Sequence, residues 1–247
     1  MIQNPSLLIQ NNANRRASPY IVNMTHAAIP ASPDRETYAR DYAAALAANG
    51  DETIFDRAEP IGLFLEWLAD AKGTEPNDAN AMGLSTVDAS GAPDSRMVLL
   101  KDIDKGGLTF FSNTESDKGL ELAAHPVAAL LFHWKSLRRQ VRVRGRVEPV
   151  SVAEADAYFA TRARESRIGA WASDQSRPLP DRATLEAAVA RETERFEGLD
   201  VPRPARWAGW RVIPTAVEFW RDRPFRLHDR LRFDLVNGEW HRDRLYP

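Results

Sequence analysis

The sequence predicts a mainly β fold with added α-helices, in which a largely antiparallel sheet curls into a barrel and helices lie at its periphery. Between residues 81 and 245, at least seven segments have the composition and length of β-strands. Most of these segments are joined by short turns, which favours antiparallel pairing and a barrel. Helical patterns precede the first strand and return between residues 152 and 197, so helices flank the strands.

The first half of the chain begins with helical segments and continues with strands. Residues 35–48 are rich in alanine, and Pro60 is a suitable first-turn residue for a second helix over 60–72. Ser116 can cap a short helix that ends near residue 124. The predicted strands of this half are residues 81–88, 94–102, 107–113, 127–134 and 138–149.

The second half holds the remaining helices and closes with strands. Ser151 and Glu154 have the spacing of a capping box, in which each side chain bonds the backbone of the other residue. The predicted elements of this half are helices at about 152–161, 164–172 and 181–197, followed by three or four strands between 207 and 245.

Composition excludes several classes of protein and site. The net charge of −2 gives no general attraction to nucleic acid or to an anionic membrane. The absence of cysteine excludes disulfides, thiolate metal sites and cysteine nucleophiles, and the five scattered histidines do not indicate a metal site. No apolar run reaches the length of a membrane span and no secretory signal is visible, so we expect a cytoplasmic protein. Residues 34–247 are expected to form one domain after a disordered tail at residues 1–33.

Two strands carry rows of cationic side chains. Along residues 138–147, Gln140 and three arginines project to one side and valines to the other. The arginines suit a solvated face, whereas the Gln140 amide can both donate and accept, as recognition of a heteroaromatic ring edge requires. Along residues 226–233 the alternation predicts Arg226, His228, Arg230 and Arg232 on one face, opposite Leu227, Leu231 and Phe233. An anionic ligand would relieve the crowding of these positive charges.

Two further clusters have the chemistry of an anion site. Arg96 and Lys101 bracket the apolar run Met97, Val98, Leu99 and Leu100. Tyr158, Arg162 and Ser166 follow one another at intervals of four, which on a helix places two hydroxyls and a guanidinium along one side. Phosphate needs such donors, although an ordinary polar helix face explains the spacing equally well. Neither common type of glycine-rich nucleotide loop is present.

Short motifs spread from about residue 55 to the C-terminus resemble the pyridoxamine (pyridoxine) 5'-phosphate oxidase family. The segments that carry the resemblance are Arg96-Met97-Val98-Leu99-Leu100-Lys101, Leu130-Leu131-Phe132-His133-Trp134, Arg139-Gln140-Val141, Ser166-Arg167-Ile168-Gly169-Ala170-Trp171, Asp174-Gln175-Ser176, Val201-Pro202-Arg203-Pro204, Glu218-Phe219-Trp220, Arg226-Leu227-His228-Asp229-Arg230 and Arg244-Leu245-Tyr246-Pro247. Each is short, but their order and spacing are highly specific.

The resemblance implies an FMN-binding split β-barrel that forms a homodimer, with FMN bound between the subunits. It implies that oxygen oxidises pyridoxamine 5'-phosphate or pyridoxine 5'-phosphate to pyridoxal 5'-phosphate, with a hydride passing from substrate C4' to flavin N5 and hydrogen peroxide released. The residues implied for the cofactor are Arg96, Met97, Val98, Leu99, Leu100, Lys101, Phe111, Ser112, Lys118, Gln140, Gln175, Ser176, Trp220 and Arg230. Those implied for the substrate are Lys101, Tyr158, Arg162, Ser166, Arg226, Leu227 and His228, of which Arg226 and His228 are the catalytic candidates that position the ring.

The sequence departs from the family pattern at one position, and it is compatible with two alternative functions. The family usually has Ser-Arg-Lys where this chain has Ser116-Asp117-Lys118, so an anion replaces a phosphate-binding cation. One alternative is a sister flavin oxidase of the phenazine-pathway type, which the second phosphate cluster around Arg162 argues against. The other is a protein that binds FMN or pyridoxal phosphate without turnover, which only Asp117 supports.

Overall fold

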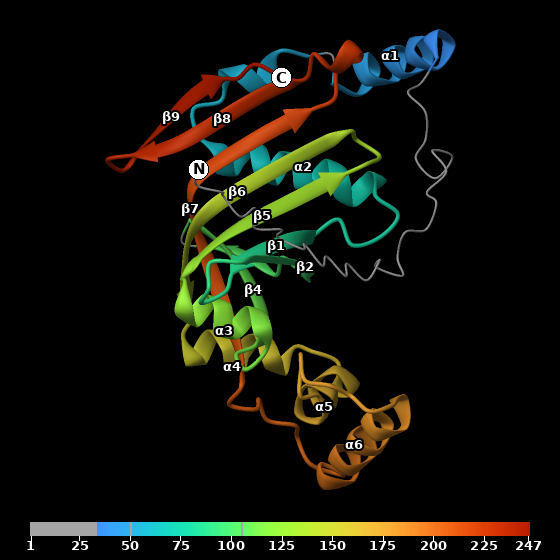
Figure 1. Cartoon of the computed structure of the whole chain (residues 1–247), viewed down its shortest axis with the longest axis vertical. Coiled ribbons are helices and arrows are strands. Elements are labelled where there is room, and N and C mark those ends of the chain that lie inside the picture. Colours follow the sequence, from blue (N-terminus) through green and yellow to red (C-terminus); the bar gives the residue numbers. More distant parts are fainter. Residues whose placement is uncertain (1–33, 50, 105) are drawn as a thin grey trace, which may run out of the picture.

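A computed structural model describes residues 34–49, 51–104 and 106–247 of the chain (Figure 1). The predicted tail at residues 1–33 lies outside the described residues. The helices are α1 (Arg35–Asn49), η2 (Thr53–Asp56), α2 (Pro60–Thr74), α3 (Asp117–Ala124), α4 (Val152–Ala160), α5 (Arg164–Ala172), α6 (Arg182–Arg195) and η3 (Pro224–Arg226). The strands are β1 (Ala81–Val87), β2 (Pro93–Leu99), β3 (Asp102–Asp104), β4 (Gly107–Asn113), β5 (Val127–Trp134), β6 (Arg139–Pro149), β7 (Trp207–Arg221), β8 (Asp229–Val236) and β9 (Glu239–Arg244).

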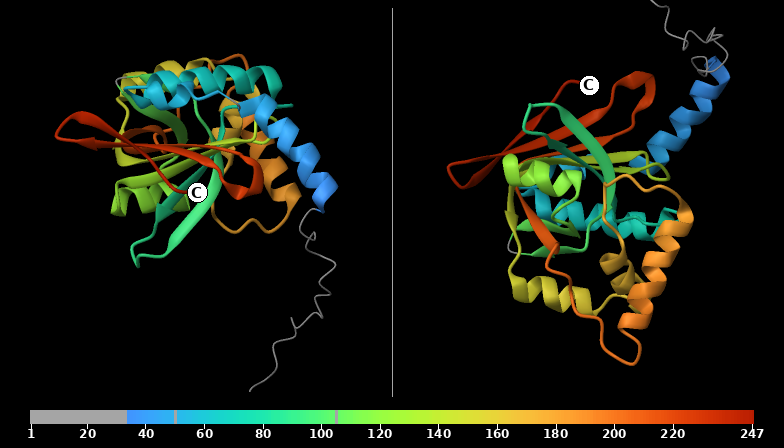
Figure 2. Two further views of the ribbon diagram at one scale, coloured as in Figure 1. Left: turned by 90° about the horizontal axis from the view of Figure 1, so that it is seen from above. Right: turned by 60° about the horizontal axis from the view of Figure 1, so that its bottom comes forward.

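All nine of these strands join one sheet, and every pair in it is antiparallel. The main path runs β2-β1-β5-β6-β7-β4-β3, and β8 with β9 attaches to β7. The first half of β7 pairs with β4 and its second half with β8, while β6 follows it on the other side. The sheet is curled rather than flat, as the two views of Figure 2 show. The predicted antiparallel, barrel-like sheet is confirmed in this open, half-barrel form.

A bulge in β7, where Thr215 has no partner on β6, bends the sheet between the part of β7 that pairs with β4 and the part that pairs with β8. The register between β6 and β7 shifts between Arg144 and Gly145. A Cβ atom at Gly145 would lie 2.0 Å from the Ile213 carbonyl oxygen, closer than any side chain can approach. Glycine is therefore required here so that the two backbones can meet at the bulge.

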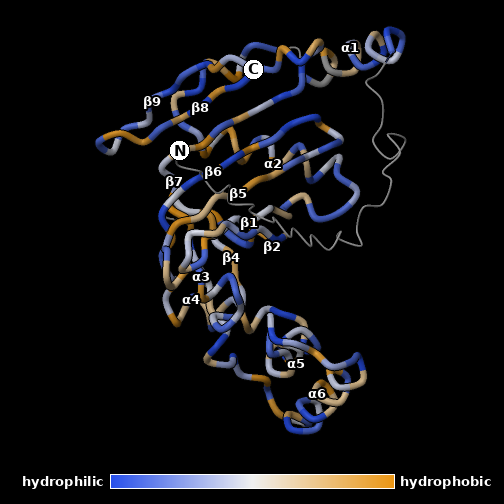
Figure 3. Tube along the Cα trace, viewed as in Figure 1, coloured by the Kyte–Doolittle hydropathy of each residue, from blue (hydrophilic) through white to orange (hydrophobic). Residues whose placement is uncertain are grey.

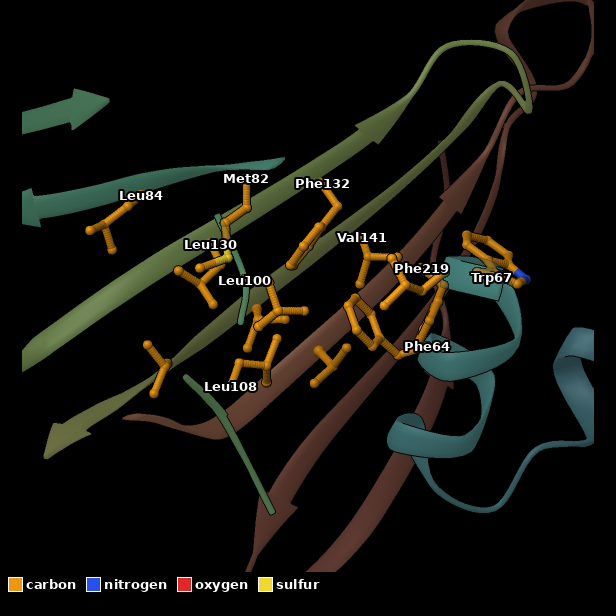
Figure 4. Packing of buried hydrophobic residues seen from close by; sticks show 14 of the residues in the cluster. Phe64, Trp67, Met82, Leu84, Leu100, Leu108, Leu130, Phe132, Val141 and Phe219 are labelled. Carbon is orange, nitrogen blue, oxygen red and sulfur yellow. The ribbon is translucent and has the colours of Figure 1, made fainter. Parts of the chain in front are cut away.

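The main core lies on the concave side of the sheet under α2. Phe64 and Trp67 of α2 are buried, and their rings lie 4.9 Å from Phe132 and 5.2 Å from Phe219, centroid to centroid (Figure 4). Edge-to-face aromatic pairs of this kind add to the free energy gained from apolar burial. The core therefore fixes β5 and β7 relative to the helix that precedes the sheet.

The opposite face of the sheet leaves apolar side chains uncovered. β5 is drawn mostly in the hydrophobic colours of Figure 3, yet Val127 and Leu131 are 48% and 41% exposed. Met97 of β2 is 67% exposed. Two adjoining hollows of about 340 and 390 Å³ lie along this face beside Leu131 and Val127. An exposed apolar face on a sheet is typical of a protein interface.

Most predicted elements are confirmed, but the strand predicted at 94–102 is broken. β2 ends at Leu99, where its pairing with β1 ends, and β3 begins at Asp102 as a partner of β4. Between them the Leu100 amide bonds the Asn80 carbonyl and the Lys101 amide bonds that of Thr109. The chain changes partner strands there, which alternation alone does not reveal.

Within the described ranges, no helix is both long enough and apolar enough to cross a bilayer.

Candidate active site

Apart from residues 96–101, the predicted site residues form two groups at opposite ends of β7 (Figure 1). We call Phe111, Ser112, Lys118, Tyr158, Arg162, Ser166, Gln175 and Ser176 the α-end group, and Gln140, Trp220, Arg226, Leu227, His228 and Arg230 the β8-end group. Trp207 opens β7 beside the first group, and Trp220 lies in the second. Twelve residues of strand lie between these two tryptophans, which corresponds to about 40 Å of extended chain.

Five members of the α-end group line a cavity of about 340 Å³. Its lining residues are Phe111, Ser112, Asn113, Arg162, Ser166, Gly169, Ala170, Ser173, Gln175 and Trp207. The prediction that Tyr158, Arg162 and Ser166 share one helix is wrong, because α4 ends at Ala160 and α5 begins at Arg164. The break between the two helices still places Arg162 and Ser166 in one cavity wall.

Arg162 carries a buried donor with nothing to bond. Among the described residues, its Nη1 atom is shielded from solvent and has no hydrogen-bond partner. Its guanidinium carbon lies 5.1 Å from the ring centroid of Trp207 and 5.4 Å from that of Phe159. Burial lowers the pKa of Arg162, and the nearby Tyr158 acts in the opposite direction. A buried cation that lacks a partner is costly, so this geometry suits an anionic ligand.

Stacked aromatic rings form one wall of this cavity. Phe111 stacks on Tyr158 with 4.2 Å between centroids and on Trp207 with 5.1 Å. Sequence reasoning missed Trp207, which supports Arg162 and lines the cavity. The only available signal was an aromatic residue opening a predicted strand, and that signal is too common to single it out.

Lys118 and Gln175 link the start of α3 to the turn after α5. The buried Lys118 ammonium donates to Gln175 Oε1 at 3.0 Å and to Ser116 Oγ at 3.3 Å, and Ser112 Oγ donates to the same Gln175 oxygen. Burial lowers the pKa of Lys118, and the charge of Arg96 adds to that effect. Both bonds of the ammonium reach neutral oxygens, so a phosphate would be a stronger partner.

Ser176 and Asp117 meet at the N-terminus of α3. The Asp117 backbone amide donates to Ser176 Oγ at 3.2 Å, and Ser176 has a φ of 70° in the turn from Asp174 to Arg177. The Asp117 side chain is 59% exposed, and its carboxylate lies 3.9 Å from Arg177. Asp117 thus faces solvent and a cation rather than the interior.

Arg96 is held by acidic neighbours beside this group. Its guanidinium donates to Glu121 at 2.8 Å, to Asp94 and to Thr86 Oγ1. Glu121 belongs to α3, so this ion pair brings Arg96 toward Lys118. The positive charge of Arg96 lowers the pKa of Lys118. The buried carboxylate therefore fixes the position of the Arg96 cation.

The rest of the 96–101 motif divides between surface and core. Met97 is exposed, Val98 and Leu99 are half-buried, and Lys101 is exposed beyond the end of β2. Leu100 is 4% exposed and packs in the main core, so its side chain cannot contact a ligand. Only its backbone is left for the cofactor contact implied by the resemblance.

The β8-end group is brought together by strand register. Gln140 lies opposite Trp220, and Trp220 lies opposite Arg230, so the three occupy neighbouring positions on β6, β7 and β8. Arg230 donates to the buried Glu218 at 2.9 Å and to the Tyr246 carbonyl at 3.0 Å. Three polar or aromatic side chains thus converge where three strands adjoin.

The strand predicted at 226–233 is wrong in its first three residues. β8 begins at Asp229, and residues 224–226 form the short helix η3, with Phe225 and Arg226 at φ values of 58° and 61°. Leu227 is 66% exposed instead of facing the core. His228 packs against Trp220 with ring centroids 4.5 Å apart. A loop rather than a strand therefore carries Arg226, Leu227 and His228.

Comparison with known proteins identifies the family to which this fold and these groups belong. The family model described as "Pyridoxamine 5'-phosphate oxidase" matches residues 69–196. The chain belongs to the pyridoxamine 5'-phosphate oxidase family. A second model, "Pyridoxine 5'-phosphate oxidase C-terminal dimerisation region", matches residues 207–247, which contain β7, β8 and β9.

Curated members of the pyridoxamine 5'-phosphate oxidase family resemble the chain over most of its length. The pyridoxine/pyridoxamine 5'-phosphate oxidase of Maricaulis maris is 62% identical over 221 residues, which are 89% of this chain and 97% of that protein. That of Caulobacter vibrioides is 60% identical over 219 residues, again 89% and 97% of the two chains.

Solved structures agree with the fold of this family. PhzG from Burkholderia lata, in complex with tetrahydrophenazine-1-carboxylic acid, superposes with a TM-score of 0.73 and 32% identity, covering 77% of this chain and 94% of that one. An FMN-binding protein of Nostoc punctiforme related to pyridoxamine 5'-phosphate oxidase gives a TM-score of 0.61 at 17% identity, covering 76% and 96%. The second likeness concerns the split-barrel fold alone.

Proposed function

We propose that this chain uses FMN and oxygen to oxidise pyridoxine 5'-phosphate and pyridoxamine 5'-phosphate to pyridoxal 5'-phosphate. Oxygen takes up the two electrons as hydrogen peroxide, and with the amine substrate water enters and ammonia leaves. Relatives with this activity in their names are 60% and 62% identical over 89% of the chain. The single structural observation that carries the proposal is the buried Nη1 of Arg162 beside Ser166, which has no hydrogen-bond partner among residues 34–49, 51–104 and 106–247.

The substrate phosphate fits the Arg162 cavity. A guanidinium and a hydroxyl offer charge-assisted hydrogen bonds to phosphate oxygens, and burial strengthens them. We infer that Arg162, Ser166 and Tyr158 bind this phosphate, with Lys101 contributing a further cation. The stacked rings of Phe111, Tyr158 and Trp207 hold these donors in place and exclude water from one side.

The donors of the two groups also fit FMN. The cations Arg96 and Lys118, with Ser112, Gln175 and Ser176, form a set of donors suited to the FMN phosphate and ribityl chain. Lys118 supports this assignment because its ammonium is buried and bonds only neutral oxygens among the described residues. Gln140, Trp220 and Arg230 offer an amide, a flat ring and a cation for the flavin ring. Bound FMN supplies the two-electron acceptor that the amino acids lack.

The cofactor site is proposed to combine the α-end group of one subunit with the β8-end group of another. Within one chain the two groups lie at opposite ends of β7, with roughly 40 Å of strand along the chain between them, and FMN is much shorter than this strand. A homodimer in which the apolar outer faces of the sheets meet would join the two groups. Support comes from the exposure of Met97, Val127 and Leu131, and from the dimerisation region matched at residues 207–247.

The loop that follows η3 is proposed to contact the substrate ring. Arg226 is the last residue of η3, and His228 lies on the loop and packs against Trp220. A cation and an imidazole can orient the ring and its substituents without removing a proton as a strong base would. Leu227, which is exposed on the same loop, can cover the ring from solvent.

The phenazine-pathway alternative has weaker support. Identity to PhzG is 32%, against 60% and 62% to the two oxidases. The Arg162 cavity also gives a second phosphate site, which a phenazine carboxylate does not need.

The cysteine-free composition needs no oxidising compartment, so we place the enzyme in the cytoplasm.

A visible spectrum of the purified protein tests the proposed function. We expect yellow protein, or protein that turns yellow and binds FMN stoichiometrically when FMN is added. Anaerobic addition of pyridoxine 5'-phosphate should bleach the flavin absorbance, and air should restore it with formation of pyridoxal 5'-phosphate. Bound flavin that the substrate fails to bleach would indicate a binding protein without turnover.

A further inference from the structure

The carboxylate of Asp222 connects His228 to the turn between β5 and β6. Asp222 Oδ1 lies 3.1 Å from His228 Nδ1, and Asp222 Oδ2 accepts from Arg138 Nη1 at 2.9 Å. The Asp222 amide also donates to the Arg138 carbonyl at 2.9 Å. Arg138 therefore holds Asp222 through two hydrogen bonds, one to its carboxylate and one from its backbone amide, and these fix the carboxylate beside the imidazole of His228.

The ion-pair chain continues to α1. Arg138 Nη2 donates to Asp41 Oδ1 at 3.0 Å. Arg138 is thus held by one carboxylate on each side, and hydrogen bonds and charge from Asp222 and Asp41 raise its pKa. Of the three residues in this series of ion pairs, Asp222 is the one that contacts the imidazole of His228.

His228 Nδ1 has two competing neighbours. The Arg223 backbone N–H donates to Nδ1 at 3.2 Å, which uses the lone pair of that nitrogen, and Asp222 Oδ1 lies 3.1 Å from the same atom as an ion-pair contact. A ring nitrogen can accept one hydrogen bond or donate one, but it cannot do both. If Nδ1 lacks a proton, its lone pair faces a carboxylate. If Nδ1 carries the proton, it donates to that carboxylate in a charge-assisted bond, which is the stronger of the two interactions.

Burial of the His228 ring favours a neutral imidazole. Burial lowers the pKa of His228, the charge of Arg226 lowers it further, and Asp222 and Asp229 act in the opposite direction with a smaller net result. Of the elements packed around the ring, β7 contributes Trp220, the segment after β7 contributes Asp222 and Arg223, η3 contributes Arg226 and β8 contributes Asp229. A neutral ring with its proton on Nδ1 leaves the lone pair on Nε2.

We propose that Asp222 is a positioning residue that holds the proton of His228 on Nδ1, so that Nε2 is presented as a hydrogen-bond acceptor to a hydroxyl or amine of the substrate. The substrate half of this inference rests on the proposed function. The tautomer half rests on the contacts of Asp222 with His228 and with Arg138, and it requires the charge-assisted bond to Asp222 to displace the one that Nδ1 accepts from the Arg223 N–H. Asp222 acts through His228 and does not itself touch the substrate.

Nitrogen-15 NMR of the FMN-loaded dimer with labelled histidine tests the tautomer directly. The imidazole shifts distinguish a protonated Nδ1 from a protonated Nε2, and the spectrum of His228→Gln identifies the signals by their loss. We expect His228 of the wild-type protein to be protonated on Nδ1 at neutral pH. Protonation on Nε2 in the wild-type protein overturns the proposal without any further variant.

Asp222→Asn should reverse the tautomer. The asparagine oxygen can still accept from Arg138, and its amide then donates to Nδ1, which moves the proton to Nε2. The pKa of His228 should fall, because the neighbouring anion is lost. Asp41→Asn is the matched control, since it removes the other carboxylate of Arg138 and should leave the His228 signals unchanged. An unchanged tautomer in Asp222→Asn overturns the proposal.

The kinetic consequence separates positioning from a structural role. With the acceptor at Nε2 lost, Asp222→Asn should raise KM for pyridoxine 5'-phosphate by about tenfold. Its flavin content and melting temperature should match those of Asp41→Asn. If the wild-type protein fails to oxidise the substrate, the proposed function is wrong, but the NMR result still decides the tautomer. A reversed tautomer with unchanged KM would overturn the assignment of Nε2 to the substrate.

Discussion

The guanidinium of Arg162 lies 5.1 Å from the ring centroid of Trp207, and its Nη1 atom is buried without a hydrogen-bond partner among the described residues. The aromatic ring supports the cation from one side and keeps water away from it. A buried donor of this kind is costly unless a ligand completes its bonding. We therefore propose that this pair marks the position at which an anionic group of the substrate binds.

We expect Arg162→Ala to damage substrate binding far more than flavin binding. Loss of a charge-assisted hydrogen bond costs about 1.5–3 kcal/mol, so KM for pyridoxine 5'-phosphate should rise by roughly tenfold or more. Loss of the phosphate contact would also misplace C4' and lower kcat. Steady-state kinetics and the ratio of flavin to protein absorbance measure the two effects. Arg182→Ala, which removes an exposed surface arginine, is the matched control and should change neither.

Arg230→Ala should show the opposite pattern and lose flavin first. Arg230 belongs to the β8-end group, which we assign to the flavin ring. The purified variant should contain less flavin, while the KM of its remaining holoenzyme should stay near that of the wild-type protein. If Arg162→Ala emptied the flavin site and left KM normal, the assignment of two separate phosphate sites would be wrong.

We expect Asp117→Arg to tighten FMN binding. The change replaces an anion by a cation at the start of α3, near Lys118. Because Asp117 is largely exposed, the gain should be on the order of 1 kcal/mol, or about fivefold in Kd. The same change removes an anion from a helix N-terminus, so the free energy of unfolding of the apoprotein should fall by about 0.3–1 kcal/mol.

Fluorescence titration of the apoprotein with FMN and with riboflavin measures this effect. The tightening should be confined to FMN, because riboflavin lacks the phosphate. Asp117→Asn should give a smaller change in the same direction. Equal tightening for both ligands would show that residue 117 acts on something other than the phosphate.

A buried carboxylate at the start of β8 should make stability depend on pH. Asp229 is 6% exposed and accepts from Arg221, Arg223 and Arg244. Burial acts to raise its pKa, but these hydrogen bonds and charges outweigh burial and lower the pKa below 3.8. Because the folded pKa is depressed, Asp229 stabilises the fold above the ordinary Asp range. This contribution is lost as the pH falls through the lower, folded pKa.

Asp229→Asn should therefore destabilise the protein at neutral pH and less so in acid. Removing one partner of a buried ion pair typically costs about 3–5 kcal/mol. Urea denaturation at a fixed protein concentration, at pH 7 and near pH 3, measures the difference. Asp234→Asn breaks a more exposed pair with Arg232 and should cost no more than about 1 kcal/mol at pH 7. A loss of stability for Asp229→Asn that is equal at both pH values would contradict the charge-based account.

Local physics made much of the fold predictable. Ser151 and Glu154 form the complete capping box that their spacing indicates, and α4 begins directly after Ser151. Ser116 caps α3 through the Gly119 amide. The alternation along residues 138–147 also holds, with Val141 and Val143 buried and the arginines outside. Each of these signals depends only on neighbours along the chain.

Features that depend on distant segments could not be predicted. The break after Leu99 arises because the chain changes from β1 to β4, and neither partner is visible in the local pattern. The interruption between α4 and α5 separates Tyr158 from Ser166, although the cavity still brings Arg162 and Ser166 together. The contact of Asp222 with His228 depends on the loop through η3, for which the sequence showed only alternation.

Subunit complementation tests most directly the claim that each active site combines the α-end group of one chain with the β8-end group of its partner. Arg162→Ala and Arg230→Ala chains with different tags are co-expressed, and the mixed dimer is compared with each parent, which should have little activity. In the mixed dimer one site carries both changes and the other carries neither. A random mixture should therefore regain about a quarter of the wild-type activity, and the isolated mixed dimer about half. Mixed dimers no more active than the parents would contradict the shared site.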